Sequence, residues 1–362
     1  MRISRARIWL GAAPALFLLA SVACGDGGQA PPTSPTTQPP SSSSADPLRE
    51  AAAAAGKLIG TAVQSSFLSD SRYTSTFSRH FDYVTAEYEM KWDPIELAQG
   101  VENFSGGDAI VAYAASQSMK VKGHALIWHG ALPGWVTGLS APALRTAVEN
   151  HIRSVVGHFR GRVLAWDVVN EAVADDGSGL RDTVFRQKLG DTYIADAFRL
   201  AREADPQALL FYNDYSGEGL NAKSNRIYDL VRGLLGDGVP IDGVGLQMHV
   251  NAVSPPSTAN IAANMRRLAD LGLLVNISEM DVRIRDVPGT AQAKLDVQRS
   301  VYNSIVAVCV AEPRCHAVTF WGFTDAHSWI DRQFGADDPL LFDESYAPKP
   351  AFFGVLDALR RR

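Results

Sequence analysis

The chain has 362 residues, of which 46% are hydrophobic and 20% charged, and its formal net charge is −5. This length and composition are typical of one large α/β domain with a short appendage. The sequence has no long run of Lys or Arg, which argues against binding to nucleic acid or to an anionic lipid surface. A neutral ligand fits this charge balance better.

The first 23 residues are predicted to be a signal peptide. An apolar stretch, 8–23, is too short to span a bilayer comfortably and follows three basic residues, Arg2, Arg5 and Arg7. The stretch ends in LASVAC, which resembles a bacterial lipobox and predicts that Cys24 becomes the lipidated first residue of the mature protein. We therefore expect an exported protein anchored at the bacterial cell surface or in the periplasm. Because Ser21 stands where the lipobox pattern prefers Leu, ordinary cleavage and secretion is the alternative.

Residues 24–46 contain the lipidation site and a predicted linker. The segment GDGGQAPPTSPTTQPPSSSSAD is rich in Pro, Ser and Thr and has almost nothing that packs. The folded domain is expected over 47–362. Once Cys24 carries a lipid, Cys309 and Cys315 remain, and in an oxidising compartment they are expected to form a disulfide. A zinc site is the competing interpretation, but CVAEPRC does not have the spacing of metal ligands.

From residue 47 onward, short apolar runs alternate with longer segments of helical period, and no two runs are joined by a two-residue hairpin turn. Helices are predicted, for example, over LRTAVENHIRSVVGHF and over NAKSNRIYDLVRGLLG, which begins with an Asn cap. The eight predicted strands are LIGTAV near 58, FDYVTAEYE near 81, KGHALIWH near 122, VLAWDVVNE near 163, LLFYNDY near 209, GVGLQMHV near 243, VNISEMDV near 275 and AVTFWGFTD near 317.

This alternation predicts an α/β fold, a (β/α)8 TIM barrel in a single catalytic domain. An open doubly wound sheet also alternates strands and helices. Polar and aromatic residues follow nearly every predicted strand, however, whereas a doubly wound sheet gathers its site near one switch point. GVG at 243–245 lacks the third glycine of a dinucleotide motif, and GxxxxGK[ST], HExxH, CxxC and GxSxG are absent. We therefore expect no cofactor and no metal.

Two of the predicted strands end near a glutamate. WDVVNEA carries Glu171, and VNISEMDV carries Glu279 about a hundred residues later. Taken singly, an acidic residue at a strand end is more often a helix cap or a solvated charge. Two carboxyls at the mouth of one barrel are sufficient to cleave a glycosidic bond, one as proton donor and the other as nucleophile or base.

The strand-end motifs resemble glycoside hydrolase family 10, the retaining endo-β-1,4-xylanases, over essentially the whole of 46–362. The motifs, in the family's order, are AEYEMKWD (86–93), GHALIWH (123–129), WDVVNEA (166–172), YNDY (212–215), GLQMH (245–249), SEMD (278–281), CVAEPRC (309–315) and WGFTDAHSW (321–329).

The resemblance implies that Glu171 is the acid/base and Glu279 the nucleophile, with their carboxyl groups about 5–5.5 Å apart. It also implies that Asn170 bonds the sugar 2-hydroxyl and that His249 bonds Glu279 and helps to keep it ionised. The other substrate-binding residues that it implies are polar (Glu87, Lys91, His124 and Gln247) or aromatic (Trp128, Trp321, Trp329 and Tyr215). Trp92 and Trp135 are expected to be packing residues that do not bind the sugar.

The sequence departs from the family pattern on the non-reducing side of the cleft. Tyr88 stands where the family usually has Asn, Gly130 and Ala131 replace a Ser-Gln pair, Met248 takes the place of a small residue, and Ile330 follows Trp329 where Arg is common. The carboxylate pair is intact, so these changes bear on chain length and decoration.

The resemblance implies an endo-1,4-β-xylanase that acts on xylan and xylo-oligosaccharides by double displacement with retention. We expect the protein to be a monomer. One alternative is a retaining hydrolase of another β-1,4-linked glycan or of short xylo-oligosaccharides. The other is a surface lipoprotein that binds glycans without cleaving them.

Overall fold

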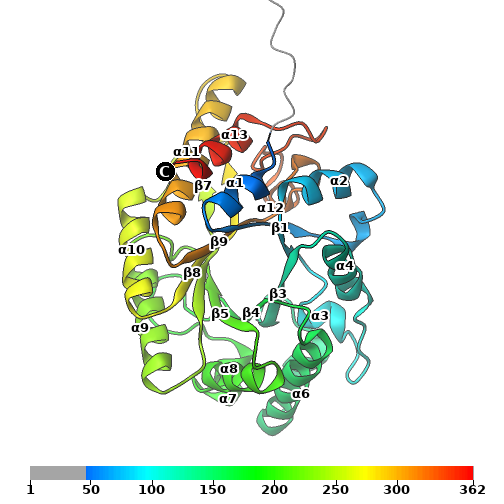
Figure 1. Cartoon of the computed structure of the whole chain (residues 1–362). Helices are drawn as coiled ribbons and strands as arrows, with labels where there is room; N and C mark the ends of the chain where they lie inside the picture. Colours follow the sequence, from blue (N-terminus) through cyan, green and yellow to red (C-terminus); the bar gives the residue numbers. More distant parts are fainter. Residues whose placement is uncertain (1–45, 362) are drawn as a thin grey trace, which may run out of the picture. The chain divides into compact units, whose positions relative to one another are not determined.

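The computed structural model describes residues 46–361, and within them the apolar runs of the sequence form parallel strands, one strand for each run except the sixth, which forms two (Figure 1). The runs are rich in β-branched and aromatic residues and are buried on both faces, as parallel strands between helices require. Their bounds are β1 Leu58–Val63, β2 Tyr83–Ala86, β3 Lys120–Ile127, β4 Ala165–Asn170, β5 Leu209–Asp214, β6 Gly243–Leu246, β7 His249–Asn251, β8 Leu274–Arg283 and β9 Cys315–Phe320.

The sheet closes on itself. Neighbours in the order β6-β5-β4-β3-β2-β1-β9-β8 are hydrogen-bonded, and β6 pairs in turn with β8. The first strand joins the last through the pair Leu58 and Ala317, and the ring is completed through Gly243 and Leu274. The predicted (β/α)8 barrel is confirmed, and the open doubly wound sheet is excluded.

The sixth predicted strand differs from the expectation. GVGLQMHV does not form one strand but divides into β6 and β7, because the backbone of Met248 lies in the left-handed region with φ 68°. The break turns the chain over the mouth of the barrel, where β7 pairs with the end of β8 through His249 and Asp281. It brings both Gln247 and His249 to the site described below.

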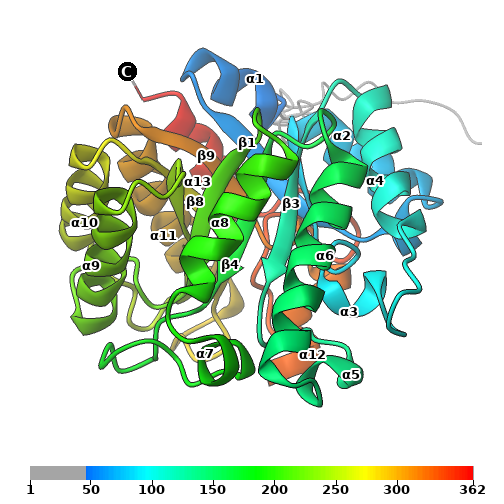
Figure 2. The ribbon, with the colours of Figure 1, turned by 90° about the horizontal axis from the view of Figure 1, so that it is seen from below.

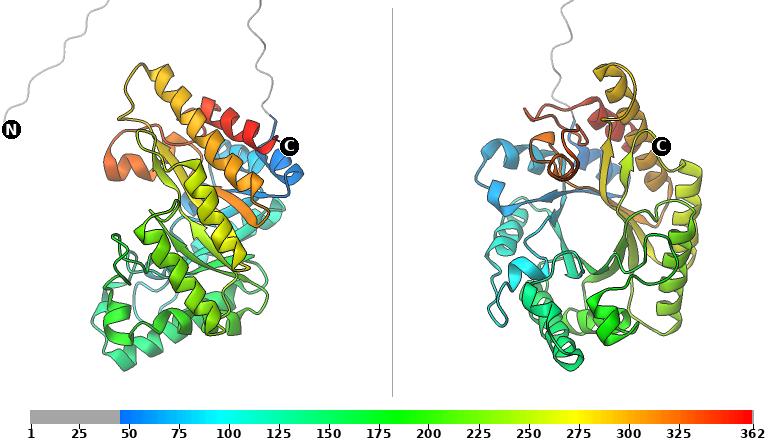
Figure 3. Two further views of the ribbon diagram at one scale, coloured as in Figure 1. Left: turned by 90° about the vertical axis from the view of Figure 1, so that its left-hand side faces the viewer. Right: turned by 180° about the vertical axis from the view of Figure 1, so that it is seen from behind.

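Helices surround the strands on all sides (Figure 3). Both helices given as examples form, and Asn221 caps the second of them by accepting a hydrogen bond from the Ser224 amide at 2.8 Å. The helices are α1 Leu48–Ala54, α2 Ser71–His80, α3 Trp92–Ile95, α4 Ser105–Ser116, α5 Gly134–Thr137, α6 Ala141–Phe159, α7 Val184–Leu189, α8 Tyr193–Ala204, α9 Ala222–Gly236, α10 Thr258–Asp270, α11 Ala291–Ala311, α12 Trp329–Phe334 and α13 Pro350–Leu359.

The two ends of the barrel are built differently. Figure 2 shows the short helices α5, α7 and α12 at one end and α1, which precedes the first strand, at the other. The short helices follow strands, so they belong to the connections at the carboxyl ends of β3, β4 and β9. In this fold class the functional site lies at that end.

The structure contains the predicted disulfide between Cys309, on α11, and Cys315, on β9. We expect the Cys309→Ala/Cys315→Ala variant to lose about 2 kcal/mol of stability, at the low end for a disulfide because the closed loop is short. In a domain of this size that loss lowers Tm by about 2–5 °C, which thermal unfolding with and without reductant measures. A Tm equal to that of the wild type contradicts this.

The predicted signal peptide, the linker and Cys24 lie outside the described residues. Within residues 46–361, no helix is both long and apolar enough to cross a membrane.

Candidate active site

A cavity of 880 Å³ lies at the carboxyl ends of the strands. Every predicted catalytic and substrate-binding residue lines it, namely Glu87, Lys91, His124, Trp128, Asn170, Glu171, Tyr215, Gln247, His249, Glu279, Trp321 and Trp329. They lie within strands β2 to β9 or in the connections that follow them, so the closed barrel brings together residues far apart in the sequence.

Glu171 follows the last residue of β4. Its backbone takes the left-handed conformation, with φ 60°, and its amide donates to the Asn213 carbonyl at 2.8 Å. The carboxylate accepts hydrogen bonds from Trp128 Nε1 at 2.8 Å, Gln247 Nε2 at 3.0 Å and Asn170 Nδ2 at 3.1 Å. Side chains from three different strand ends therefore fix the position of this carboxylate.

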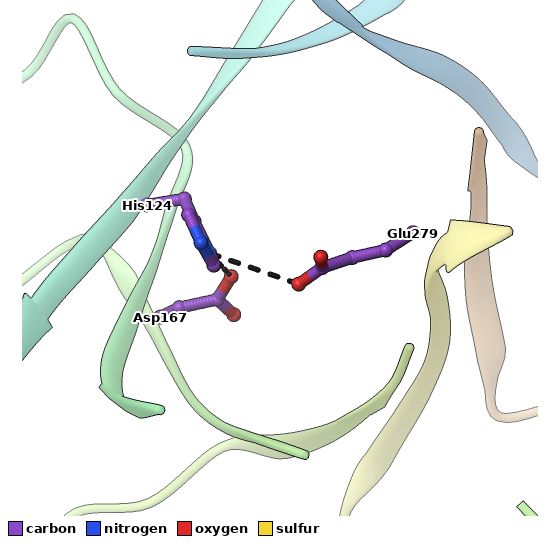
Figure 4. Close-up of side chains that lie close together, drawn as sticks. All are labelled: His124, Asp167 and Glu279. Carbon is purple, nitrogen blue, oxygen red and sulfur yellow. Dashed lines mark hydrogen bonds and ion pairs between the residues drawn. The ribbon is translucent and has the colours of Figure 1, made fainter. Parts of the chain in front are cut away.

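Glu279 lies within β8 and is almost fully buried. Figure 4 shows its carboxylate pointing across the barrel towards His124 and Asp167, which come from β3 and β4. Asn213 Nδ2 donates to one carboxylate oxygen at 2.6 Å, and His249 Nε2 lies 3.4 Å from the other. The same Asn213 amide also donates to Asn170 Oδ1 at 2.8 Å, so a short chain of side chains connects the two glutamates.

The charges around Glu279 favour its ionised form. Burial raises the pKa of this carboxyl, but electrostatic interactions with His124, His249 and Lys122 and the His249 hydrogen bond outweigh burial and lower the pKa to about 2. His249 is held between two carboxylates, since its Nδ1 lies 2.8 Å from Asp281 Oδ2. Burial lowers the pKa of His249, but Asp281 and Glu279 together raise it well above its usual value.

This pKa predicts acid sensitivity. The folded-state pKa of Glu279 is depressed, so its contribution to stability is present above the unfolded pKa, near 4.5, and is lost as pH falls towards about 2. Relative to Glu279→Gln, the wild type should lose about 2 kcal/mol of unfolding free energy between pH 5 and pH 3. Urea unfolding of both proteins at the two pH values measures this, and equal losses contradict it.

His124, Asp167 and Glu279 carry ligand atoms that all lie within 4.8 Å of one another. Their other contacts disfavour a metal ion, because Lys122 Nζ lies 2.7 Å from Asp167 Oδ2 and His124 Nδ1 lies 2.8 Å from the same oxygen. A divalent cation there meets the charge of a buried lysine. Instead, Lys122 and His124 both contact Asp167, and His124 in turn faces Glu279, so the side chains form one charge network.

Aromatic rings form the walls of the cavity. Lys91, which is buried, lies with its Nζ 4.6 Å from the centroid of Trp128 and 5.8 Å from that of Trp321. Trp329 is held by a hydrogen bond from its Nε1 to Asp281 Oδ2 at 2.8 Å. Trp92 and Trp135 pack against each other, as expected, and do not line the cavity. Ring faces beside hydrogen-bonding groups suit a sugar, which has apolar faces and a polar edge.

The departures from the family pattern have structural consequences. Tyr88 is 45% exposed at the rim, and its hydroxyl donates to Asp93 at 2.5 Å. A Cβ atom at Gly130 would lie 2.5 Å from the Trp128 ring, so glycine leaves room for this ring where it donates to Glu171. Ile330 and Met248 are fully buried.

Several residues that shape the site were not predicted from the sequence. Asn213 and Asp281 lie inside the motifs YNDY and SEMD, and their polar character in a buried strand was the available signal. Arg332 was also missed: it lines the cavity and forms an ion pair of 3.1 Å with Glu87, 245 residues away in the sequence. Nothing in the local pattern around Arg332 predicts that contact.

A (β/α)8 barrel with two glutamates and aromatic walls in a cavity at the carboxyl ends of its strands has the architecture of a glycoside hydrolase. The model of glycosyl hydrolase family 10 matches residues 47–358. Endo-1,4-beta-xylanase B of Thermotoga neapolitana is 40% identical over 322 residues, which are 87% of this chain and 92% of that protein. The endo-1,4-beta-xylanase of Agaricus bisporus is 40% identical over 312 residues, 85% of this chain and 92% of the relative.

A similar solved structure is xylanase 10B from Thermotoga petrophila RKU-1 in complex with xylobiose. Its TM-score is 0.83 at 42% identity, and the match covers 86% of this chain and 97% of that one. The chain therefore belongs to glycosyl hydrolase family 10.

Proposed function

We propose that this protein is an endo-1,4-β-xylanase that hydrolyses internal bonds of xylan with retention of configuration. The observation that carries the proposal is the pair of glutamates in one cavity, one ionised among cations and the other held by three donors. Its relatives named as endo-1,4-beta-xylanases support the choice of substrate.

Glu279 acts as the nucleophile. Its carboxylate attacks the anomeric carbon, the bond to the leaving oxygen breaks, and a covalent glycosyl-enzyme forms. The low pKa of Glu279 keeps it charged for this attack, and His249 and Asn213 hold its oxygens in place. A charged nucleophile with fixed oxygens loses little energy to reorganisation when the reaction begins.

Glu171 acts as the proton donor to the leaving oxygen in the first step. In the second step it removes a proton from water, which attacks the anomeric carbon and releases Glu279. When Glu279 is esterified its negative charge is lost, so Glu171 faces a neutral ester during the second step. One pair of carboxyls thus serves both steps.

The substrate side of the proposal rests on the cavity walls. Trp128, Trp321 and Trp329 offer ring faces, and Glu87, Lys91, His124, Asn170 and Gln247 offer donors and acceptors for sugar hydroxyls. Tyr215 completes the wall on the leaving-group side. The cavity size of 880 Å³ is within the range of small-ligand sites and suits a short stretch of an open chain.

The test is a product profile. Xylohexaose should be cut at internal bonds into xylobiose, xylotriose and xylotetraose, and proton NMR at early times should show the β-anomer as the first product. Cellohexaose under the same conditions is the comparison, since glucose differs from xylose by a hydroxymethyl group. Faster cleavage of cellohexaose favours another β-1,4-glycan as substrate, and no cleavage of either favours the non-catalytic glycan binder.

We also propose that the protein is exported and carries a lipid on Cys24. The LASVAC sequence supports this. Expressed in a bacterial host, the wild type should partition into the membrane fraction and add the mass of a diacylglyceryl group to its N-terminal peptide. Cys24→Ser should appear in the soluble fraction, and equal partition of both proteins contradicts lipidation.

A further inference from the structure

One arginine holds the backbone that follows Glu171. Arg181 donates hydrogen bonds to three consecutive backbone carbonyls. Its Nε donates to the Glu171 carbonyl at 3.1 Å, its backbone amide donates to the Ala172 carbonyl at 2.7 Å, and its Nη2 donates to the Val173 carbonyl at 3.3 Å. The residues that line the cavity do not include Arg181. Its main contacts are therefore with the backbone that carries Glu171 and not with a bound sugar.

The opposite side of the same backbone is held by β5. The Glu171 amide donates to the Asn213 carbonyl, and the amides of Ala172 and Val173 both donate to the Tyr212 hydroxyl at 3.1 Å. Arg181 and β5 together satisfy both the amides and the carbonyls of these residues. That arrangement holds Glu171 at φ 60°, a conformation that a residue with a side chain rarely adopts.

Arg181 also reaches the cavity wall. Its Nη2 donates to the Tyr215 hydroxyl at 3.0 Å and to Asp175 Oδ1 at 2.7 Å. The Arg181 side chain is 20% exposed and that of Asp175 is 62% exposed, so the bond to Tyr215 is the better shielded of the two. One planar guanidinium thus connects the backbone of Glu171 with Tyr215, and a lysine has no second set of donors to do the same.

We propose that Arg181 is a positioning residue that fixes the direction in which Glu171 delivers its proton. This inference rests on the proposed role of Glu171 as acid/base. Without the guanidinium, the carbonyls of Glu171 and Val173 lose a donor, and the backbone relaxes away from the left-handed conformation. The carboxylate then moves relative to the leaving oxygen, and a displacement of about 1 Å can cost about 100-fold in rate.

The inference predicts a loss that depends on the leaving group. A sugar leaving group must be protonated as its bond breaks, whereas 2,4-dinitrophenolate leaves without a proton. We expect Arg181→Met to lower kcat/KM for xylohexaose by about 10–100-fold and kcat/KM for 2,4-dinitrophenyl β-xylobioside by about threefold or less. Arg181→Lys should show the same selectivity with a smaller loss, and it serves if the methionine variant does not fold.

Arg186→Met is the matched control. Arg186 follows on the same connection, but it donates to the Leu180 carbonyl at 2.7 Å and pairs with Asp191, and it makes no bond to Glu171. Its substitution should leave the ratio of the two kcat/KM values unchanged. Thermal unfolding of each variant reports whether the fold is retained.

Equal losses on both substrates in the Arg181 variants, or no loss on xylohexaose, overturn the inference. Glu171→Ala, measured beside them, distinguishes a failure of the role of Arg181 from a failure of the role of Glu171. If Glu171→Ala shows the selective loss and the Arg181 variants do not, only the role of Arg181 fails. If Glu171→Ala itself shows no selective loss, the proposed function of Glu171 fails, and the inference fails with it.

Discussion

Glu279→Ala should reduce hydrolysis of xylan and of xylohexaose by about 10⁴-fold or more, because removal of a nucleophile leaves only the binding and acid components of catalysis. The substitution also leaves His124 and His249 without the carboxylate that faces them. A steady-state assay at neutral pH measures the loss, and a far-ultraviolet circular dichroism spectrum shows whether the barrel is intact.

The control for this prediction keeps the shape of the side chain. Glu279→Gln preserves the volume and an acceptor for Asn213 but removes the charge and most of the nucleophilicity, so it should be as inactive as the alanine variant. Activity near that of the wild type in either variant ends the assignment. Binding of xylobiose should persist in Glu279→Gln, because the aromatic walls are unchanged.

Glu171→Ala is expected to have the second largest effect, a loss of about 10²–10⁴-fold on xylan, the range for general acid–base catalysis. With 2,4-dinitrophenyl β-xylobioside, formation of the glycosyl-enzyme should proceed at nearly the wild-type rate, since no proton is needed. Its hydrolysis should be slow, because the base that activates water is missing. A rapid burst of dinitrophenol followed by a slow steady state is the expected time course.

Azide provides the check on this second prediction. It is an anion that attacks the glycosyl-enzyme without help from a base, so it should restore the steady-state rate of Glu171→Ala and yield β-xylobiosyl azide. The wild type should gain little. Absence of both the burst and the azide effect contradicts the assignment of Glu171. Trp128, Asn170 and Gln247 lose a hydrogen-bond partner in this variant, so its Tm should be measured alongside.

The barrel was predictable because its strands have a strong local signal. The runs ending at Asn170 and Asp214 are short, rich in apolar residues and buried along nearly their whole length, which is typical of parallel strands covered on both faces. The disulfide was predicted from the number of cysteines together with the expected oxidising compartment. Within the site, the positions of Glu171 and Glu279 followed from the fact that parallel strands in a barrel end at the same face.

Other features depend on backbone geometry that hydropathy does not encode. The left-handed residue Met248 splits the sixth strand, although every second residue of GVGLQMHV from Val244 to Val250 is apolar, as expected for one continuous strand. Trp128 was predicted as a stacking wall, yet its indole also donates to Glu171, which the glycine at 130 permits. Arg332 contacts Glu87, which is far away in the sequence, and Arg181 contacts Glu171 across a loop. Neither arginine belongs to a recognisable motif.

The most direct test of the account is to trap the covalent intermediate. Incubation with 2,4-dinitrophenyl 2-deoxy-2-fluoro-β-xylobioside should inactivate the enzyme in step with release of dinitrophenol, because fluorine slows hydrolysis of the glycosyl-enzyme more than its formation. Mass spectrometry should find one fluoroxylobiosyl group per chain, on the peptide that contains Glu279. A label on another residue, or turnover of the enzyme with no label at all, contradicts the central claim that Glu279 is the nucleophile of a retaining hydrolase.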